Sequence, residues 1–209
     1  MFRTLDARCR LVQQRRAYAK LTPHSEDTTP TGTEEMIDLE YSRERMLTDI
    51  GASEEIPAAS SIAALASPEF LTGAMARVIV KGRQREELLP HLNAALSARF
   101  ANVAPQMLDG DLLAPLKKAV GNAWKRGNQM HPDKWITVEV VVTKKGALIE
   151  VSDEGAGFDV RALLDKLRSG EKYYQHAGSG FRRFAKTDSV VSFANGGRTF
   201  RACFKATLG

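Results

Sequence analysis

The segment 114–128, APLKKAVGNAWKRGN, combines an asparagine with basic residues in a pattern that could hold a metal–phosphate group. Asn122 lies among small and apolar residues at helical spacing, and Lys125 and Arg126 follow it within about one turn. An amide oxygen is a ligand that Mg²⁺ accepts, whereas an asparagine on a helix is more often solvated or capping. The segment alone leaves both interpretations open.

Two Gly-x-Gly turns later in the chain could bring backbone N–H groups close to a phosphate. In SDEGAGFD, residues 152–159, Asp153 follows a strand-like run and precedes Gly155 and Gly157. The second turn, HAGSGF at 176–181, contains Gly178, Ser179 and Gly180. Glycine permits positive φ and close backbone approach. A single Gly-x-Gly is nevertheless an ordinary turn in most proteins, and Asp153 alone would be interpreted as a turn residue capping its own backbone.

Hydrophobic periodicity predicts the elements that carry the asparagine. The apolar, β-branched run at 76–80 is typical of a strand. Residues 85–100 are predicted as a helix whose inward-facing residues are Leu88, Leu92, Ala95, Leu96 and Phe100. Residues 111–126 form a second predicted helix, with Leu112, Leu116, Ala119, Ala123 and Trp124 toward the core. Asn122 therefore lies on a helix that packs on the core.

Two β-hairpins are predicted around the first glycine turn. Residues 135–142 and 147–152 are β-branched runs joined through a Lys-Gly turn, and residues 189–206 contain a second pair of runs around ANGGR. Residues 160–168 are predicted as a short helix between the hairpins. This order predicts an α+β fold, a two-layer sandwich in which helices cover one face of a mixed, largely antiparallel sheet.

The N-terminal third differs in composition from the rest. Residues 1–67 are predicted to be a low-complexity, partly disordered tail, and the folded domain is expected at 76–206. Residues 34–50 are the exception, because their apolar residues can share one side of a helix after a Thr33 cap, namely Met36, Leu39, Leu47 and Ile50. Such a helix could dock on the body or on a partner.

The composition is that of a globular protein without a membrane span. Hydrophobic residues make up 43% and charged residues 26% of the 209 residues, and no apolar run approaches the roughly 20 residues that a spanning helix needs. The two cysteines, Cys9 and Cys203, form neither a C-x-x-C pair nor a disulfide framework. A reducing, cytoplasmic location is therefore expected.

The net charge of +5 raises the question of nucleic acid as a partner. Residues 21–60 carry ten acids and two bases, whereas residues 61–209 carry 22 bases and 14 acids. In the sequence these bases are scattered and are not interleaved with aromatic residues that could stack on bases. A solvated basic surface is the favoured interpretation, so nucleic-acid binding is considered unlikely.

Taken together, the asparagine helix, the two glycine turns and NGGRTF at 195–200 resemble the ATP-binding Bergerat domain of histidine kinases, type II topoisomerases, heat-shock chaperones and mismatch-repair ATPases. The likeness is strongest to the small anti-sigma factor serine/threonine kinases of bacteria. Their pattern reads roughly Glu-x-x-x-Asn-Ala-x-x-His-Gly-Asn, then Asp-x-Gly-x-Gly-Phe-Asp, a Gly-x-Gly lid and a final Gly-Gly-x-Thr. KAVGNAWKRGN, DEGAGFD, HAGSGF and NGGRTF occupy these places. The resemblance covers about residues 76–206.

This resemblance implies ATP and Mg²⁺ as cofactors. Asp153 would accept a hydrogen bond from the adenine amino group, and Asn122 would hold Mg²⁺. Gly155 and Gly157 would leave space beneath the base, and Thr199 would support the adenine side through its hydroxyl. The remaining nucleotide-binding residues implied are Lys125, Arg126, Gly178, Ser179 and Gly180, of which the lid glycines would wrap the phosphates.

Two residues depart from the family pattern. Lys118 stands where the family has the Glu that activates the attacking nucleophile, and Arg126 stands where a His is usual. A lysine in water is protonated at neutral pH and cannot serve as the general base that a carboxylate provides. Three alternatives follow: altered catalysis through Lys118, stronger nucleotide binding without efficient turnover, or a Lys118 side chain that points to solvent.

The resemblance therefore implies an ATP-binding regulatory protein of the anti-sigma type, with weak or no phosphoryl transfer. It would bind a protein partner, a sigma factor or an anti-anti-sigma-like protein, in a nucleotide-dependent way. An active serine/threonine kinase or a slow ATPase is the alternative. Family members of this kind often pair, so a homodimer is also considered.

Overall fold

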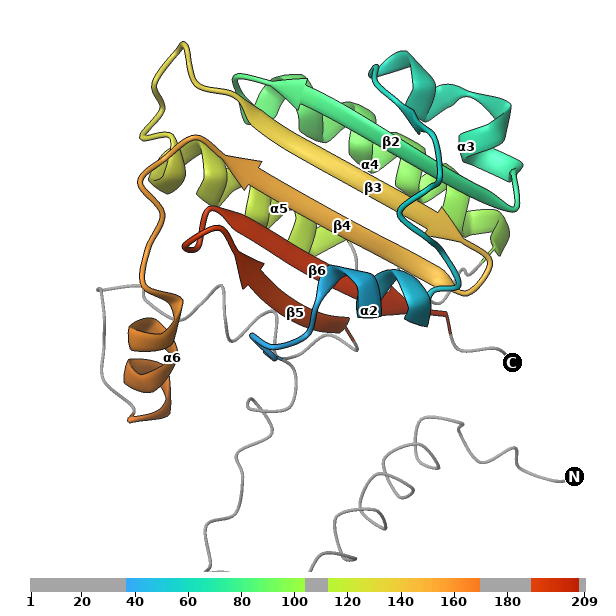
Figure 1. Ribbon diagram of the computed structural model, residues 1–209. Helices are drawn as coiled ribbons and strands as arrows, with labels where there is room; N and C mark the ends of the chain where they lie inside the picture. Colours follow the sequence, from blue (N-terminus) through green and yellow to red (C-terminus); the bar gives the residue numbers. More distant parts are fainter. Residues whose placement is uncertain (1–36, 104–112, 170–188, 207–209) are drawn as a thin grey trace, which may run out of the picture. The chain divides into compact units, whose positions relative to one another are not determined.

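The β-branched runs of the sequence form one open sheet (Figure 1). The computed structural model describes residues 37–103, 113–169 and 189–206, all of which belong to the unit Gly32–Gly209 into which the chain divides after Thr31. The strands described are β1 Ala58–Ala59, β2 Met75–Gly82, β3 Ile136–Thr143, β4 Gly146–Asp153, β5 Ser189–Ala194 and β6 Thr199–Lys205. They lie in the order β1-β2-β3-β4-β6-β5.

The pairing of these strands is mixed and largely antiparallel, as predicted. The short strand β1 runs parallel to β2, and the pairs β2–β3, β3–β4, β4–β6 and β5–β6 are antiparallel. Both predicted hairpins are confirmed. The register Ile136↔Asp153 and Ser152↔Thr199 places the end of β4 between the starts of β3 and β6. One end of the sheet therefore collects these three strand termini.

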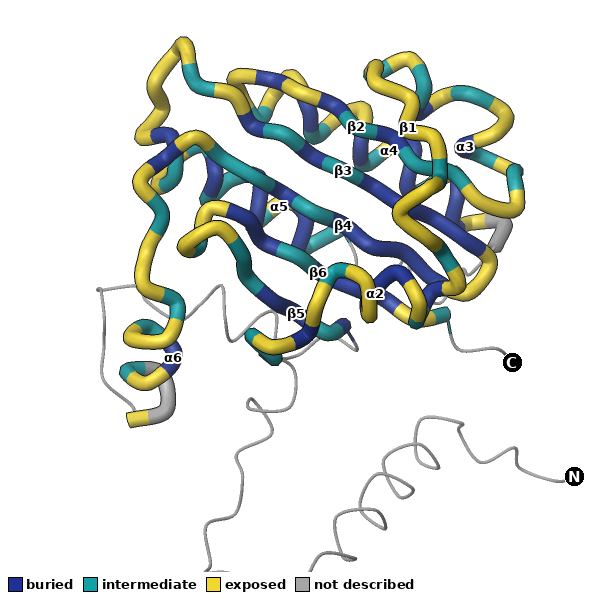
Figure 2. Tube along the Cα trace, viewed as in Figure 1, coloured by how far each residue is buried: buried dark blue, intermediate teal, exposed yellow. Residues whose placement is uncertain are grey.

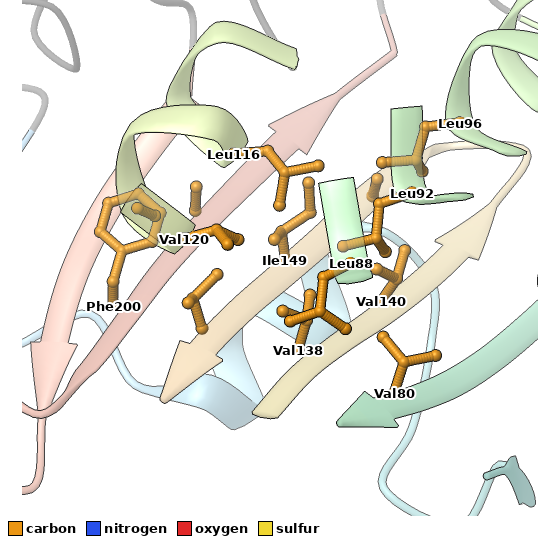
Figure 3. Close-up of a cluster of buried hydrophobic side chains, with 14 of the residues drawn as sticks. Val80, Leu88, Leu92, Leu96, Leu116, Val120, Val138, Val140, Ile149 and Phe200 are labelled. Carbon is orange, nitrogen blue, oxygen red and sulfur yellow. The ribbon is translucent and has the colours of Figure 1, made fainter. Parts of the chain in front are cut away.

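Two helices cover one face of the sheet, behind it in Figure 1. They are α4, Arg85–Val103, and α5, Leu113–Asn122, which continues as the π-helical turn η3, Ala123–Gly127. The predicted inward residues of α4 are buried, and Figure 3 shows several of them against β2, β3 and β4. The predicted residues Leu116 and Ala119 of α5 and Ala123 of η3 are also buried, and Trp124 of η3 is partly buried against the core. Leu112 lies outside the described residues.

A third helix lies on the opposite face, in front of the sheet in Figure 1. This helix, α2, spans Arg43–Asp49 and is capped by Ser42, whose Oγ accepts a hydrogen bond from the Arg45 N–H. It closes a second hydrophobic cluster made of Tyr41, Met46, Leu47, Ile50, Val141, Leu148 and Cys203. The prediction of a helix over 34–50 after a Thr33 cap is therefore too long by several residues and wrong about its cap.

Described residues before 76, the expected start of the folded domain, also pack in the domain. Ile37 forms a parallel bridge with Val191 on the edge strand β5. The 3₁₀ turn η1, Ala63–Ala66, and helix α3, Pro68–Thr72, bury Leu65 and Phe70 in the main core. Residues 37–75 thus contribute to the domain, with Ile37, Leu65 and Phe70 in the main core and the α2 residues in the second cluster, whereas residues 1–36 lie outside the described residues.

Partly buried charges bind the α2 segment to its face of the sheet. Arg43 pairs with Glu54 from the following loop, with Glu139 of β3 and with Glu150 of β4. Arg77 on β2 also contacts Glu139, at 2.8 Å, and Arg201 on β6 contacts Glu150, at 3.0 Å. Glu139 and Glu150 therefore each have two guanidinium partners, which offsets part of the cost of burying them.

Helix α6, Val160–Arg168, has the bounds predicted from its periodicity. Leu164 is its buried residue among those whose side chains are described, and Figure 2 shows the helix largely exposed, in contrast to the buried residues along β3, β4 and β6. Within the described ranges, no helix has the length and apolar character needed to cross a bilayer.

Candidate functional site

The Asp153 carboxylate lies against the backbone of Gly127, where the π-helical turn η3 ends. A Cβ placed on Gly127 would come within 2.5 Å of Asp153 Oδ1, closer than real Cβ atoms approach. A Cβ on Gly155 would lie 2.8 Å from the same oxygen and would overlap the Gly127 carbonyl. Glycine at both positions thus lets the end of the asparagine helix, the end of β4 and the following turn pack together.

Asn128 fixes this contact with two hydrogen bonds. Its Nδ2 donates to the carbonyl of Trp135 at 3.0 Å, and its Oδ1 accepts from the Glu154 N–H at 2.8 Å. The residue is fully buried. Because Trp135 precedes β3 and Glu154 follows β4, the Asn128 amide joins the end of η3 to both strands of the central hairpin. A buried amide that is satisfied in this way holds the geometry of the site.

Asp153 is an unusual carboxylate because it is only half-exposed and carries few hydrogen bonds. Burial raises the pKa of Asp153, and this effect outweighs the hydrogen bond from the Gly155 N–H and the positive charges of Arg198 and Lys134, which lower it. The Gly155 N–H donates to Oδ1 at 2.8 Å. A desolvated acceptor with a raised pKa at the end of a strand is typical of functional sites.

The turn after Asp153 packs on the turn between β5 and β6. Gly157 has a φ of 77°, and a Cβ there would overlap the Gly196 carbonyl and lie 3.1 Å from the Arg198 Cγ. The Phe158 N–H donates to that same carbonyl at 2.9 Å. The space beside Gly155 and Gly157 is therefore filled by backbone, which differs from the expectation that these glycines leave room beneath a base.

Thr199 does not face the same side of the sheet as Asp153. Val151 of β4 and Phe200 of β6 are paired and belong to the core under α4 and α5, so Ser152 and Thr199, one residue away, face the α2 side. The Thr199 hydroxyl lies 3.0 Å from Ser152 Oγ, and it accepts a hydrogen bond from Asn195 Nδ2 at 3.0 Å. The hydroxyl is thus committed within the sheet, away from the Asp153 carboxylate.

The residue beside Asp153 is Arg198, which immediately precedes β6. Its carbonyl accepts a hydrogen bond from the Asp153 N–H at 3.1 Å, and its guanidinium favours the ionised form of the Asp153 carboxyl. The Arg198 Nε donates to the Asn195 carbonyl at 3.0 Å. Sequence reasoning missed Arg198, Gly127 and Asn128, although the last two stand at the final Gly-Asn of the family pattern.

Helix α5 and the turn η3 carry the four helical residues predicted for the site, two of them half-buried and two exposed. Asn122 and Lys118 are four residues apart, so they share one side of α5, and both are half-buried. The Asn122 side chain does not cap the π-helical turn. Lys125 and Arg126 lie in η3 and are exposed. Gly127, five residues after Asn122, is therefore the point at which this helical segment contacts the Asp153 carboxylate.

Strained backbone follows this helix directly. Gln129 and Met130 have φ of 54° and 58°, a region that costs about 1–3 kcal/mol for residues other than glycine. Hydrogen bonds from the Met130 N–H to the Trp124 carbonyl and from the Asn128 N–H to the Ala123 carbonyl hold the chain there. π-Helical turns and such strain are both frequent at functional sites.

The predicted phosphate lid, Gly178, Ser179 and Gly180, lies outside the described residues. Within the described part of the chain, no cluster of three or more histidine, cysteine, aspartate or glutamate side chains forms a metal site. A Mg²⁺ ion at Asn122 would therefore rely on oxygen ligands from phosphate and water, which is usual for this ion.

The site thus presents a half-buried acceptor, Asp153, fixed by backbone and by Asn128 to a helix that carries a polar and cationic side. Such an arrangement can accept a hydrogen bond from a ligand amino group near Asp153 while cations attract negative charge. The chain matches no family model, and no curated protein is significantly similar to it.

Proposed function

We propose that this chain is an ATP-binding regulatory protein with a Bergerat-type domain, similar to the anti-sigma factor kinases, that binds a protein partner according to its nucleotide state. The observation that supports it best is the contact of Asp153 with Gly127. It brings the proposed adenine acceptor to the end of the same helical segment that bears Asn122. The partner, a sigma factor or an anti-anti-sigma-like protein in the cytoplasm, and a possible homodimer rest on the sequence resemblance.

The residues of the site fit an adenine nucleotide. A carboxylate accepts about four hydrogen bonds, and the Gly155 N–H uses one of these acceptor positions on Asp153. Because the carboxylate is half-buried, a hydrogen bond from an amino group there is stronger than in water. The supporting backbone is rigid, since Asn128 and the tight glycine contacts hold it. Thr199 is not part of this binding surface, and Arg198 takes the position next to Asp153.

Asn122 would supply a neutral oxygen ligand to Mg²⁺, and the ion when bound would neutralise phosphate charge. Lys118 lies on the same side of α5, where its positive charge would add to the attraction for phosphates. A lysine there supplies no general base, so we expect nucleotide binding with weak or no phosphoryl transfer.

Thermal unfolding with and without ATP–Mg²⁺ tests the proposal. A ligand at 100 times its dissociation constant stabilises the native state by about 2.7 kcal/mol, which corresponds to roughly 5–10 °C for a chain of this size. We expect this rise for the wild-type chain and its loss in Asp153→Asn. Equal shifts in the wild-type chain and in Asp153→Asn would contradict the proposal.

Turnover is tested separately at Lys118. Incubation with γ-labelled ATP is expected to give little phosphate release, and Lys118→Glu is expected to raise hydrolysis because it supplies the carboxylate that the family uses. Efficient hydrolysis or transfer by the wild-type chain would instead favour the kinase or ATPase alternative.

A further inference from the structure

The two tryptophans of the chain each lie under an arginine. The Arg83 guanidinium carbon is 4.6 Å from the centre of the Trp135 ring, and that of Arg85 is 5.0 Å from the centre of the Trp124 ring. Both arginines come from the junction of β2 and α4, whereas Trp124 lies in η3 and Trp135 just before β3. Folding thus assembles Arg–Trp pairs from segments that are about 40–50 residues apart in the sequence.

We call these two neighbouring pairs and Lys125 the Arg–Trp surface, made of Arg83, Arg85, Trp124, Lys125 and Trp135, because Arg83 and Arg85 are only two residues apart in the chain. The Lys125 ammonium is 5.9 Å from the centre of the Trp124 ring. The side chain of Trp135 is 38% exposed, which is high for a large aromatic residue. Lys125, Arg83 and the nearby Met130 are exposed as well. The surface therefore presents one accessible aromatic ring, that of Trp135, together with cations, whereas Trp124 is partly buried against the core.

Stacking on an indole ring orients a guanidinium for binding phosphate. The guanidinium carbons lie over the rings at 4.6 and 5.0 Å, and a guanidinium stacked on an aromatic ring keeps N–H donors that can reach two oxygens of one phosphate. Glu86 contacts Arg85 at 2.5 Å, but both side chains are about half-exposed, and such surface pairs contribute little. A phosphate can therefore replace this carboxylate at small cost.

We propose that the Arg–Trp surface binds single-stranded nucleic acid, with bases stacked on Trp135 and phosphates held by Arg83, Arg85 and Lys125. Exposed aromatic rings combined with cations are the usual means of binding single strands without sequence preference. The net charge of residues 37–209, with 24 bases and 20 acids, is positive and adds a modest long-range attraction for a polyanion. A duplex is bound more weakly because its base faces are already stacked inside it.

Carboxylates near this surface reduce its positive charge, so electrostatic attraction alone would not bind a polyanion tightly. The Glu154 carboxylate accepts a hydrogen bond from the backbone N–H of Trp135 at 3.0 Å, and the Glu87 carboxylate accepts one from the backbone N–H of Arg83 at 2.8 Å, so each carboxylate lies beside a residue of the surface. Phosphate binding therefore has to be supplemented by base stacking to give useful affinity. The need for stacking favours a single strand over an acidic protein partner, because such a protein offers carboxylates but no nucleobases.

Intrinsic fluorescence reports on this surface directly, because the chain has no tryptophans besides Trp124 and Trp135. The full-length chain is titrated with a 20-nucleotide oligothymidylate at low salt. We expect quenching of the tryptophan emission, and binding that weakens as salt rises. Poly-L-glutamate and a duplex of the same length are titrated in parallel and are expected to quench much less.

Variants locate the binding, which is followed by anisotropy of a labelled oligonucleotide. Trp135→Ala is expected to weaken binding about 5- to 150-fold, the effect of losing one base–aromatic stack. Arg83→Ala, which keeps both tryptophans, is expected to weaken binding and to flatten its salt dependence. Arg45→Ala is the matched control, because Arg45 also stacks on an aromatic ring, 4.5 Å from the centre of Tyr41, but on α2.

Circular dichroism and thermal unfolding check that each variant is folded. If Trp135→Ala does not fold, Arg83→Ala and Lys125→Ala decide the question. The proposal is overturned by an absence of quenching at low salt. It is also overturned if Arg83→Ala binds like Arg45→Ala, or if poly-L-glutamate quenches as strongly as the oligonucleotide, since the surface would then fit an acidic protein.

Discussion

Gly127 and Asp153 are in such close contact that no side chain fits between them. A Cβ on Gly127 would lie 2.5 Å from Asp153 Oδ1. The contact ties the end of η3 to the end of β4, the two segments that carry the proposed nucleotide-binding residues. It therefore offers a way to perturb the site from a residue that does not itself bind a ligand.

Gly127→Ala is expected to destabilise the fold by about 1–3 kcal/mol, because the added methyl group forces η3 away from Asp153. It should also weaken nucleotide binding. Gly121→Ala is the matched control, since a Cβ there meets no atom within 4 Å and the residue lies within helix α5. This control should raise stability by about 0.5–1 kcal/mol. Urea unfolding measures both, and equal effects of the two substitutions would refute the packing argument.

Asn128→Ala removes the link between η3 and the central hairpin. Truncation leaves the partly buried Trp135 carbonyl and Glu154 N–H without their partner, at a total cost of roughly 1–3 kcal/mol. Gln129→Gly serves as the control, because the φ of 54° at this exposed position suits glycine and no stability should be lost. Urea denaturation of both variants gives the comparison. If Asn128→Ala is as stable as the wild-type chain, the Asn128 amide does not stabilise the contact between η3 and the central hairpin.

Asp153 gives stability a characteristic pH dependence. Its folded-state pKa is raised by burial, so the folded protein favours the protonated carboxyl, and this contribution is lost as pH rises through the folded-state pKa. Asp153→Asn keeps an oxygen for the Gly155 N–H and carries no charge. We therefore expect the variant to be more stable than wild type at pH 7 and to lose that advantage toward pH 4. Urea unfolding at the two pH values measures this difference, and an advantage that grows on acidification would have the wrong sign.

The Arg43 ion pairs are expected to anchor α2. Arg43→Ala leaves Glu139 and Glu150 with one guanidinium each, Arg77 and Arg201, and should cost roughly 2–4 kcal/mol, somewhat less than breaking a fully buried pair. Arg161→Ala breaks an exposed pair with Glu40 and should change stability by less than about 1 kcal/mol. Denaturant unfolding compares the two. A similar small effect at both positions would mean that α2 is held by its apolar residues alone.

Cys203 is expected to be unreactive in the folded protein. Burial raises the pKa of its thiol to about 12, so very little thiolate exists at pH 8. Relative to a free cysteine, reaction with a thiol reagent should slow on the order of a thousandfold. A Cys9→Ser variant isolates the measurement, and denaturant should restore fast labelling. Rapid labelling under native conditions would show that the cluster under α2 opens readily.

Local pattern was sufficient to predict most elements. The helix at 160–168, the hairpins and the inward residues of α4 follow from periodicity that agrees with the tertiary environment. The helix predicted at 34–50 was too long because Ile37 pairs with the edge strand β5 in an extended conformation. Helical spacing of apolar residues does not show this pairing, since it depends on a strand far along the chain.

The site was predicted less completely, for reasons of register and long-range packing. Thr199 was expected beside the adenine, but a shift of one residue along a strand moves a side chain to the other face, and Arg198 is the residue next to Asp153. The Gly127–Asp153 contact and the Arg–Trp pairs join residues far apart in sequence, so spacing does not show them.

Calorimetric titration of the full-length chain with ATP–Mg²⁺, beside Asp153→Asn, tests the central claim most directly. The proposed function predicts saturable binding at a single site in the wild-type chain and its loss in the variant, whose fold is verified by unfolding. It also predicts that GTP–Mg²⁺ binds more weakly, because guanine has a carbonyl oxygen where adenine has the amino group that would donate a hydrogen bond to Asp153. An absence of binding to the wild-type chain, or equal binding to the variant, would contradict the account.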